Sequence, residues 1–141
     1  MQVQDKCSFE WAKKLQDAGF VAPAYEPGQI WYDKIGRPTI IANVWPSGIM
    51  NTANLKTGAG GRVMNVPEGS VYAPGVSELM KDISFNAYYS PDVYYRIERK
   101  DFRVAEETPG GAGTMQDISG NANICDALAE AWIANRKGVP A

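Results

Sequence analysis

The stretch NICDALAEAWIANRK, residues Asn123–Lys137, shows the clearest helical pattern in the sequence. Its apolar residues recur at helical spacing and share one side of a helix that turns about 100° per residue: Ile124, Cys125, Leu128 and Trp132. Three charged residues share the other side: Asp126, Glu130 and Lys137. A helix with one apolar side must cover another element, and the middle of the chain shows the alternation that is typical of strands. We therefore predict that this helix packs on a β-sheet.

A second helix is predicted near the start of the chain, over Ser8–Ala18. Ser8 is a typical N-cap, because its hydroxyl can accept a backbone N–H that has no partner inside the helix. Gly19 follows the last turn, where a residue in the left-handed conformation usually ends a helix. Trp11 and Leu15 lie on the apolar side, so we interpret Trp11 as a residue that anchors the helix to the core.

The first strands are predicted directly after this helix. Gln29–Ile35 and Thr39–Trp45 are rich in β-branched and aromatic residues and are separated by a short glycine-containing turn, which favours an antiparallel hairpin. The following segment, Pro46–Gly69, contains several glycines and polar residues and is interpreted as a long loop, with a short strand near Gly61–Val66. Loops of this length in a compact domain are usually functional or mobile.

The second half of the chain predicts a short helix and a further hairpin. Tyr72–Ile83 carries apolar residues at i, i+3, i+4 and i+7, which places them on one helix face. Val93–Glu98 alternates apolar and polar residues as a half-buried strand does, and a last strand begins at Phe102. We expect the segment Glu106–Asn121 to be a loop.

These elements predict an α+β fold in a single globular domain over residues 1–141. An antiparallel sheet of about four strands would carry the N- and C-terminal helices on one face, with a short middle helix in addition. The length of 141 residues is ordinary for one domain, and the fractions of apolar residues (45%) and charged residues (21%) are those of a globular protein.

The charge and the hydrophobicity of the chain exclude some function classes. The net charge of −2 argues against a protein that binds duplex DNA, which would normally show a basic excess. No run of apolar residues is long enough to cross a membrane, so no membrane partner is expected. The first residues, Met1–Lys6, lack the basic start and apolar run of a signal peptide. These features together predict a cytoplasmic protein.

The sequence contains few residues suited to catalysis. Cys7 and Cys125 are interpreted as buried thiols without a disulfide, and they could bridge only if the two terminal helices begin side by side. The chain has no histidine, which removes the commonest general base and the commonest zinc ligand. No pair of carboxylates has a spacing that indicates general acid–base catalysis. We therefore predict no catalytic residue, no cofactor and no metal site, and a protein that is not an enzyme.

A cluster of tyrosines and basic residues is the most suggestive surface in the sequence. The candidate interaction residues are Tyr88, Tyr94, Arg96, Arg99 and Arg103. Tyrosine and arginine are enriched in the hot spots of protein interfaces, and tyrosines beside arginines can also stack single-stranded bases. A third interpretation is structural: alternate tyrosines of one strand pack the core and cover a half-exposed face. A protein partner, a nucleic acid and simple packing all remain open, with nucleic acid the least favoured partner.

The glycine-rich part of Pro46–Gly69 suggests a second kind of site. The run around Gly58–Arg62 resembles a phosphate-binding loop in composition, but the required G-x-x-x-x-G-K-[ST] pattern is absent. A nucleotide-binding loop is therefore not expected there. A small-ligand site or an active site near residues 46–69 is kept as an alternative function.

Several motifs resemble a family of small, uncharacterised phage and prophage proteins, mostly from Bacteroidetes. The matching residues are Cys7–Phe20 (CSFEWAKKLQDAGF), Gln29–Tyr32, Tyr72–Pro74 with Ser77–Leu79, and the alanine-rich closing helix at Ala127–Trp132. Residues 46–69 and 108–121 do not match and look like insertions. The resemblance implies a small α+β fold and an origin in a phage or mobile element, and so a bacterial host cell. It implies no activity and no catalytic residues.

Three functions follow from these observations. The first is a non-enzymatic accessory protein, encoded by a phage or mobile element, that binds another macromolecule, most simply a protein. The second is a small-ligand-binding protein or enzyme with a site near residues 46–69. The third is a virion or assembly component.

Overall fold

The structure is a computed structural model that describes residues 5–86, 92–96, 99–107 and 115–137. The chain divides into two compact units, Met1–Ala73 and Pro74–Ala141, and each is described by itself. The described residues form three helices and two antiparallel sheets, so the predicted α+β class is confirmed. The expectation of a single domain over residues 1–141 stays a prediction.

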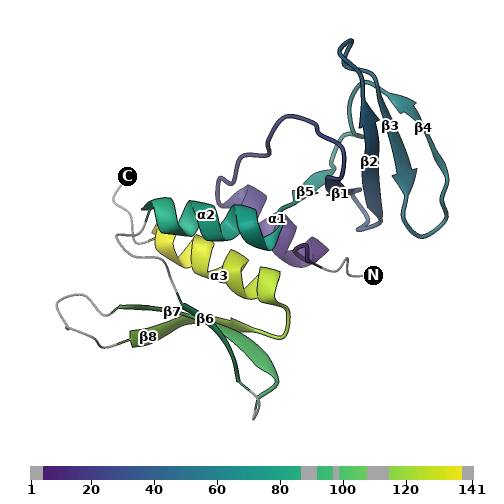
Figure 1. The fold of residues 1–141 in the computed structure, drawn as a ribbon. Coiled ribbons are helices and arrows are strands. Elements are labelled where there is room, and N and C mark those ends of the chain that lie inside the picture. The colour runs from purple at the N-terminus through teal and green to yellow at the C-terminus, as the bar shows by residue number, and fades with distance from the viewer. Residues whose placement is uncertain (1–4, 87–91, 97–98, 108–114, 138–141) are drawn as a thin grey trace. The chain divides into compact units, whose positions relative to one another are not determined.

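The first unit contains one helix and a five-stranded antiparallel sheet in the order β4-β3-β2-β1-β5 (Figure 1). Its elements are α1 (Phe9–Asp17), β1 (Ile30–Tyr32), β2 (Pro38–Val44), β3 (Met50–Asn54), β4 (Gly60–Val63) and β5 (Val71–Ala73). The hairpin predicted from two strands between residues 29 and 45 is confirmed, because β1 pairs with β2 antiparallel.

The ends of α1 follow from its local sequence. The Ser8 hydroxyl accepts the backbone N–H of Trp11 at 3.4 Å, which confirms the predicted N-cap. At the other end Gly19 has a φ of +102°, and the N–H of Phe20 bonds to the carbonyl of Leu15 at 2.9 Å. The N–H of Gly19 also bonds to the carbonyl of Gln16, so the helix ends in a Schellman motif.

The two faces of the five-stranded sheet have different partners. Trp31, Ile41, Met50 and Tyr72 form a buried cluster on one face, packed against the segment around Tyr25 and other partly buried residues. On the other face Tyr32 is fully buried, and its hydroxyl donates a hydrogen bond to the carbonyl of Cys7 at 2.5 Å. The ring of Phe9, the first residue of α1, lies 5.7 Å from that of Tyr32. Thus α1 covers the end of the sheet formed by β1 and β5, and it does not cover the end formed by β3 and β4.

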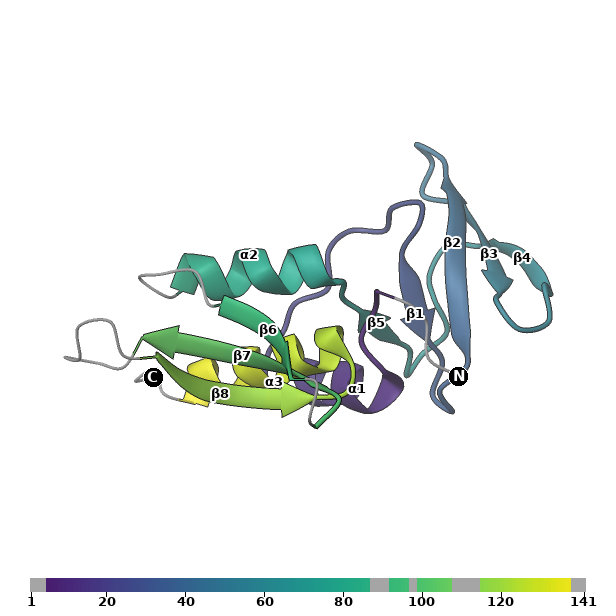
Figure 2. The ribbon, with the colours of Figure 1, turned by 60° about the horizontal axis from the view of Figure 1, so that its bottom comes forward.

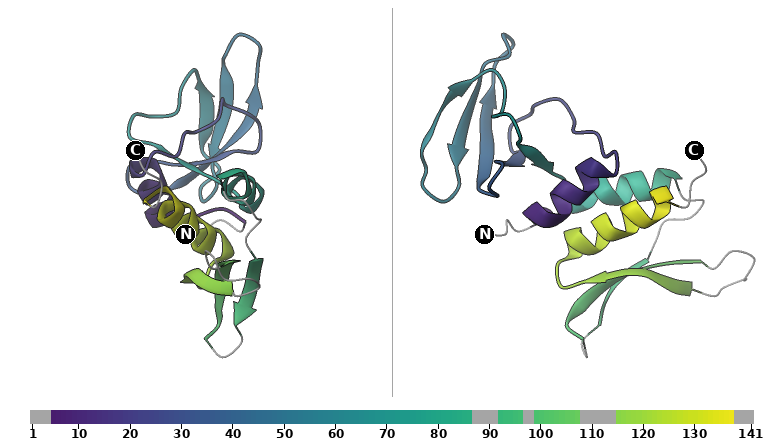
Figure 3. Two further views of the ribbon diagram at one scale, coloured as in Figure 1. Left: turned by 90° about the vertical axis from the view of Figure 1, so that its left-hand side faces the viewer. Right: turned by 180° about the vertical axis from the view of Figure 1, so that it is seen from behind.

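The second unit is built in three layers. Its elements are α2 (Val76–Asn86), β6 (Asp92–Arg96), β7 (Asp101–Glu107), β8 (Met115–Asn121) and α3 (Ile124–Lys137). The three strands form an antiparallel sheet in the order β6-β7-β8, and they run side by side in Figure 2. Helix α3 packs on β7 and β8 with one side and on α2 with another, so it is the middle layer (Figure 3).

This position makes α3 more buried than its sequence predicted. The predicted helix and its packing on a sheet are confirmed, since α3 contacts β7 and β8. Leu128 is fully buried and Trp132 is 2% exposed. Asp126, which the sequence placed on the side of the helix opposite the apolar residues, is also buried. A helix between two layers is apolar on more than one side, and its alanines are short enough for both neighbours to approach closely. These alanines are Ala127, Ala129 and Ala131, all fully buried.

Two predictions about the strands were wrong: that they form a single four-stranded sheet, and that two long segments are loops. The described strands form two sheets, and each terminal helix packs on its own sheet: α1 contacts β5, and α3 contacts β7 and β8. Residues 46–69, expected to be a loop with a short strand near Gly61–Val66, contain the hairpin of β3 and β4, and β4 overlaps the expected strand. The segment 106–121, expected to be a loop, contains the end of β7 and all of β8. The middle helix begins at Val76 rather than at Tyr72, because Tyr72 belongs to β5 and pairs with Trp31.

Candidate functional site

The sheet of the second unit places Tyr94 directly opposite Arg103 on neighbouring strands. These two residues are a registered pair of β6 and β7, and Gly120 of β8 is the next residue in the same row. The adjacent row, Val93, Val104 and Ser119, faces α3, because the Ser119 hydroxyl donates to the carbonyl of Ala127 in α3 at 2.6 Å. Neighbouring rows point to opposite faces of a sheet, so Tyr94 and Arg103 point away from α3.

Arg103 is held in place by its surroundings. Its Nη2 lies 3.0 Å from Oδ2 of Asp101, two residues earlier on the same face. Across the sheet, a Cβ placed on Gly120 would lie 2.7 Å from the guanidinium. The arginine therefore lies flat over the backbone of β8, in space that only a glycine leaves open. We call the surface formed by Tyr94, Asp101, Arg103 and Gly120 the tyrosine–arginine face.

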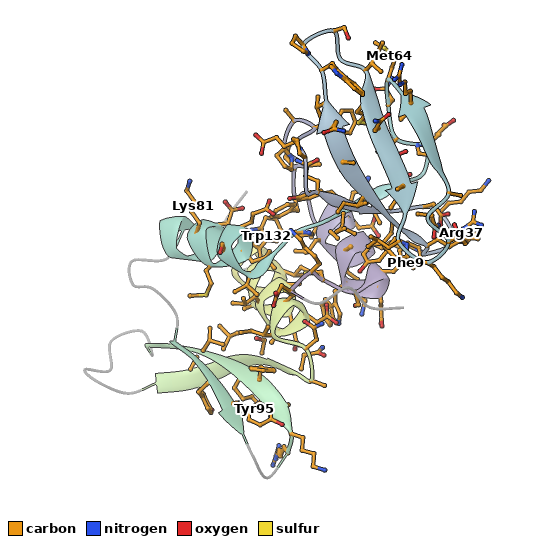
Figure 4. The ribbon with its side chains drawn as sticks, turned by 45° about the vertical axis from the view of Figure 1, so that its right-hand side comes forward. Phe9, Arg37, Met64, Lys81, Tyr95 and Trp132 are labelled. Atoms are coloured by element: carbon orange, nitrogen blue, oxygen red, sulfur yellow. The ribbon has the colours of Figure 1, made fainter. Side chains whose placement is uncertain are left out.

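Two neighbouring tyrosines differ in what they contact. Tyr94 is 41% exposed and lies on the tyrosine–arginine face. Tyr95 is 49% exposed, points to the opposite face and packs on Phe102 with 4.9 Å between the ring centroids (Figure 4). The two side chains are matched in chemistry and exposure, and they differ in the face that they present.

The other predicted interaction residues stand as follows. Tyr88 lies outside the described residues. Arg96 is opposite Asp101 in the register of β6 and β7, and nothing is described of its side chain. Arg99 is exposed at the turn after β6. The structure thus brings Tyr94 and Arg103 together, and Arg99 lies at the end of the same hairpin.

Neither cysteine forms a disulfide in the described part of the chain. Cys7 and Cys125 are both buried, as the sequence indicated. Buried thiols in apolar surroundings behave as small hydrophobic side chains. The described residues contain no group of three or more carboxylates and thiols placed to hold a metal ion.

A second exposed surface lies at the free end of the five-stranded sheet, within the segment expected to be a loop. Four large apolar side chains of this region are exposed: Trp45, Ile49, Leu55 and Met64. The guanidinium carbon of Arg62 lies 5.5 Å from the centre of the Trp45 ring, within the range of a cation–π contact. Met64 lies beside the turn that joins β2 to β3 (Figure 4). We call this surface, with the outer edge of β4, the β4 edge surface.

The charge of this region could have indicated the surface from the sequence. Between positions 38 and 67 the only charged residues are Lys56 and Arg62, although the whole chain has a net charge of −2. All sixteen acidic residues lie elsewhere in the chain. The glycines of this segment resemble a phosphate-binding loop only in composition, whereas its lack of carboxylates is the sequence signal that marks this surface.

Comparison of the chain with protein-family models, with curated proteins and with solved structures finds no match. In the part of the chain that the structure describes, every helix is too short or too polar to cross a bilayer.

Proposed function

We propose that this protein is a non-enzymatic binding module that contacts another protein through the tyrosine–arginine face. The observation that carries the proposal is the pairing of Tyr94 with Arg103 on the sheet face turned away from α3. Among the described elements of the second unit, α3 is the helix that packs on this sheet, and it packs on the opposite face. We favour a protein partner over a nucleic acid.

The chemistry of the two side chains suits a protein interface. Tyrosine adds a large contact area with few rotatable bonds, and arginine can donate several hydrogen bonds in a fixed plane. Holding Arg103 against Asp101 and Gly120 reduces the conformational entropy that its side chain would lose on binding. A partner carboxylate or carbonyl could then accept from the guanidinium while an apolar group contacts the Tyr94 ring.

We further propose a phage or mobile-element origin and a cytoplasmic location in a bacterial host. The support for both is the resemblance of residues such as Cys7–Phe20 to phage-type proteins. The support for a non-enzymatic role is the absence of histidine from the sequence. Phage genes beside this gene would strengthen the proposed origin.

The proposed face is tested by comparing Tyr94→Ala with Tyr95→Ala. Each folded variant and the wild-type protein is used to capture partners from bacterial lysate, and the captured proteins are quantified by mass spectrometry. We expect Tyr94→Ala to lose a partner that Tyr95→Ala retains, because truncating a tyrosine that is a binding hot spot costs about 2 kcal/mol or more. Equal capture by both variants would contradict the proposal. Capture that disappears after nuclease treatment would favour a nucleic acid instead.

A further inference from the structure

The outer edge of β4 is an unpaired sheet edge. β4 is the last strand of the five-stranded sheet, and within the described residues it pairs only with β3. Its residues Gly60, Gly61 and Arg62 are exposed. The two glycines have no side chain that could keep another backbone at a distance. An edge of this kind presents backbone N–H and C=O groups to which an added strand can bond.

The face beside this edge combines a cation with apolar side chains. Arg62 is opposite Asn51 of β3, which in turn is opposite Asn43 of β2, so this row points away from the row of Met50 and Val63 in the core. Arg62 contacts the ring of Trp45, which is 38% exposed. Met64, which is 56% exposed, follows at the end of β4. A strand added to β4 would therefore meet a positive charge near its middle and apolar side chains near one end.

The charge distribution identifies the chemistry of that strand. Lys56, in the turn before β4, and Arg62, within β4, are the only charged residues from position 38 to position 67. No carboxylate of this segment neutralises either cation or repels an acidic ligand. A partner with carboxylates would gain attraction along the edge and would meet no like charge from this segment.

We infer that the β4 edge surface binds an extended acidic peptide segment of a partner protein, which adds to the sheet as a sixth strand beside β4. Its backbone bonds to the outer edge of β4, its carboxylates lie near Arg62 and Lys56, and an apolar side chain contacts Trp45 or Met64. This surface belongs to the first unit and is separate from the tyrosine–arginine face of the second, so the two proposals stand or fall independently.

Two other occupants fit the surface less well. A second copy of this chain, paired through β4, would place two copies of the same cationic strand side by side, and like charges on neighbouring strands are destabilising. An anionic lipid surface would attract the cations and accept Trp45 and Met64, but lipid chains offer no backbone groups for the edge of β4. Of the three occupants, only an acidic strand can hydrogen-bond to the edge of β4, attract the cations and contact the apolar side chains.

The test uses the full-length chain and a display library of random short peptides. We expect the selected peptides to alternate acidic and apolar residues. A chosen peptide is then resynthesised with N-methyl groups at alternate backbone positions, in each of the two possible phases. One phase should abolish binding, because a strand added to an edge donates its N–H groups to the sheet from every second residue.

Charge-reversal variants locate the site. Arg62→Glu should weaken the peptide about tenfold or more, since it replaces an attraction by a repulsion. The matched control Lys34→Glu, which changes the net charge equally at the turn between β1 and β2, should leave binding within about twofold. Replacing the acidic residues of the peptide by lysine should restore binding to Arg62→Glu.

Four results would overturn the inference. The first two concern selection: no peptide is enriched, or the selected peptides lack acidic residues. The third is that Arg62→Glu and Lys34→Glu weaken binding equally. The fourth is that the peptide still binds when it is N-methylated in either phase. Concentration-dependent dimerisation abolished by Arg62→Glu would assign the edge to a second copy of the chain. Binding to vesicles of phosphatidylserine and phosphatidylcholine, lost in Arg62→Glu, would assign it to an anionic lipid surface.

Discussion

The indole N–H of Trp132 in α3 donates a hydrogen bond of 3.1 Å to Oδ2 of Asp82 in α2. Trp132 is 2% exposed, so its ring fills the interface of the two helices while its one polar atom reaches a partner at the border. Buried tryptophans usually find such a partner for the indole N–H. This single side chain therefore joins α2 to the helix that packs on the sheet.

Replacing Trp132 by alanine is expected to lower the free energy of unfolding by about 3–5 kcal/mol, because it removes a buried aromatic side chain and leaves a cavity. Trp132→Phe keeps most of the apolar contact and loses the hydrogen bond to Asp82, so it should cost about 1–2 kcal/mol. Chemical denaturation measures both. A near-neutral Trp132→Ala would mean that α3 is not held by this contact.

Two adjacent glycines of β4 should respond differently to alanine. A Cβ on Gly60 would lie 2.0 Å from the carbonyl oxygen of Thr52, whereas a Cβ on Gly61 would meet nothing within 4 Å. We expect Gly60→Ala to cost about 1–3 kcal/mol, because the clash is with backbone and cannot be relieved by a rotamer change. Gly61→Ala should change stability by less than about 0.5 kcal/mol. Similar melting temperatures for the two variants would contradict the pairing of β3 with β4.

Asp33 should make the stability of the first unit dependent on pH. Partial burial raises the pKa of Asp33, but hydrogen bonds from Arg37 and from the N–H of Ile35, with the charge of Arg37, outweigh it and hold the pKa below its ordinary value. The Arg37 Nε lies 2.7 Å from Oδ2 of Asp33. Because the pKa is lower in the folded protein, the ionised carboxylate stabilises the fold at neutral pH.

We therefore expect Asp33→Asn to destabilise the protein by about 1 kcal/mol near pH 7, a modest figure because the pair is open to solvent. The difference should persist down to the ordinary aspartate pKa of about 4 and should disappear as the pH falls through the lowered pKa of the folded state. Urea denaturation of both proteins over this range measures it. If the difference in unfolding free energy between the two proteins grew on acidification, the lowered pKa of Asp33 would be contradicted.

The N-terminus of α3 depends on Asn123. Its Oδ1 accepts the backbone N–H of Asp126 at 3.1 Å. We expect Asn123→Ala to cost about 1 kcal/mol through the loss of this cap, and Asn123→Asp to restore most of it, since aspartate caps equally well. Thermal unfolding of the three proteins is sufficient. An alanine variant as stable as the wild type would show that the buried contacts of α3 alone fix where it begins.

The sequence predicted best where a local signal and the tertiary packing agree. Helix α1 was predicted from Ser8 and Gly19, and the structure uses both residues to begin and end it. The pairing of β1 with β2 was predicted from two apolar runs and a short turn, and Asp33 and Gly36 form that turn. In these places the residues that specify an element lie within a few positions of it.

The strands that were missed are those without such a local signal. β3 reads Met50-Asn-Thr-Ala-Asn54, a composition that does not favour a strand. β4 begins with two glycines, and it was predicted only as a short strand near Gly61–Val66, without a partner. They form because Asn54 closes the hairpin: its side chain accepts the N–H groups of Lys56 and Thr57, and pairing with β2 then extends the sheet. The burial of Asp126 could not be predicted from the local sequence either, because it depends on the layers that pack on more than one side of α3.

The residues of the candidate site could be predicted from the sequence, but their arrangement could not. Tyr94 and Arg103 were named from their clustering along the chain, but only the register of β6 and β7 makes them direct neighbours. The role of Gly120 in leaving room for the guanidinium depends on β8, a strand that was not predicted from the sequence. We propose that this arrangement binds a partner protein.

Site-specific photo-crosslinking in bacterial cells tests the proposed binding through this face. A photoreactive phenylalanine analogue is placed at position 94 in one protein and at position 95 in a second. Because the two positions are similarly exposed on opposite sheet faces, they form a matched pair. We predict a discrete crosslinked adduct with a partner protein from position 94 and none from position 95. An adduct from position 95 alone, or no more adduct from 94 than from 95, would contradict the claim.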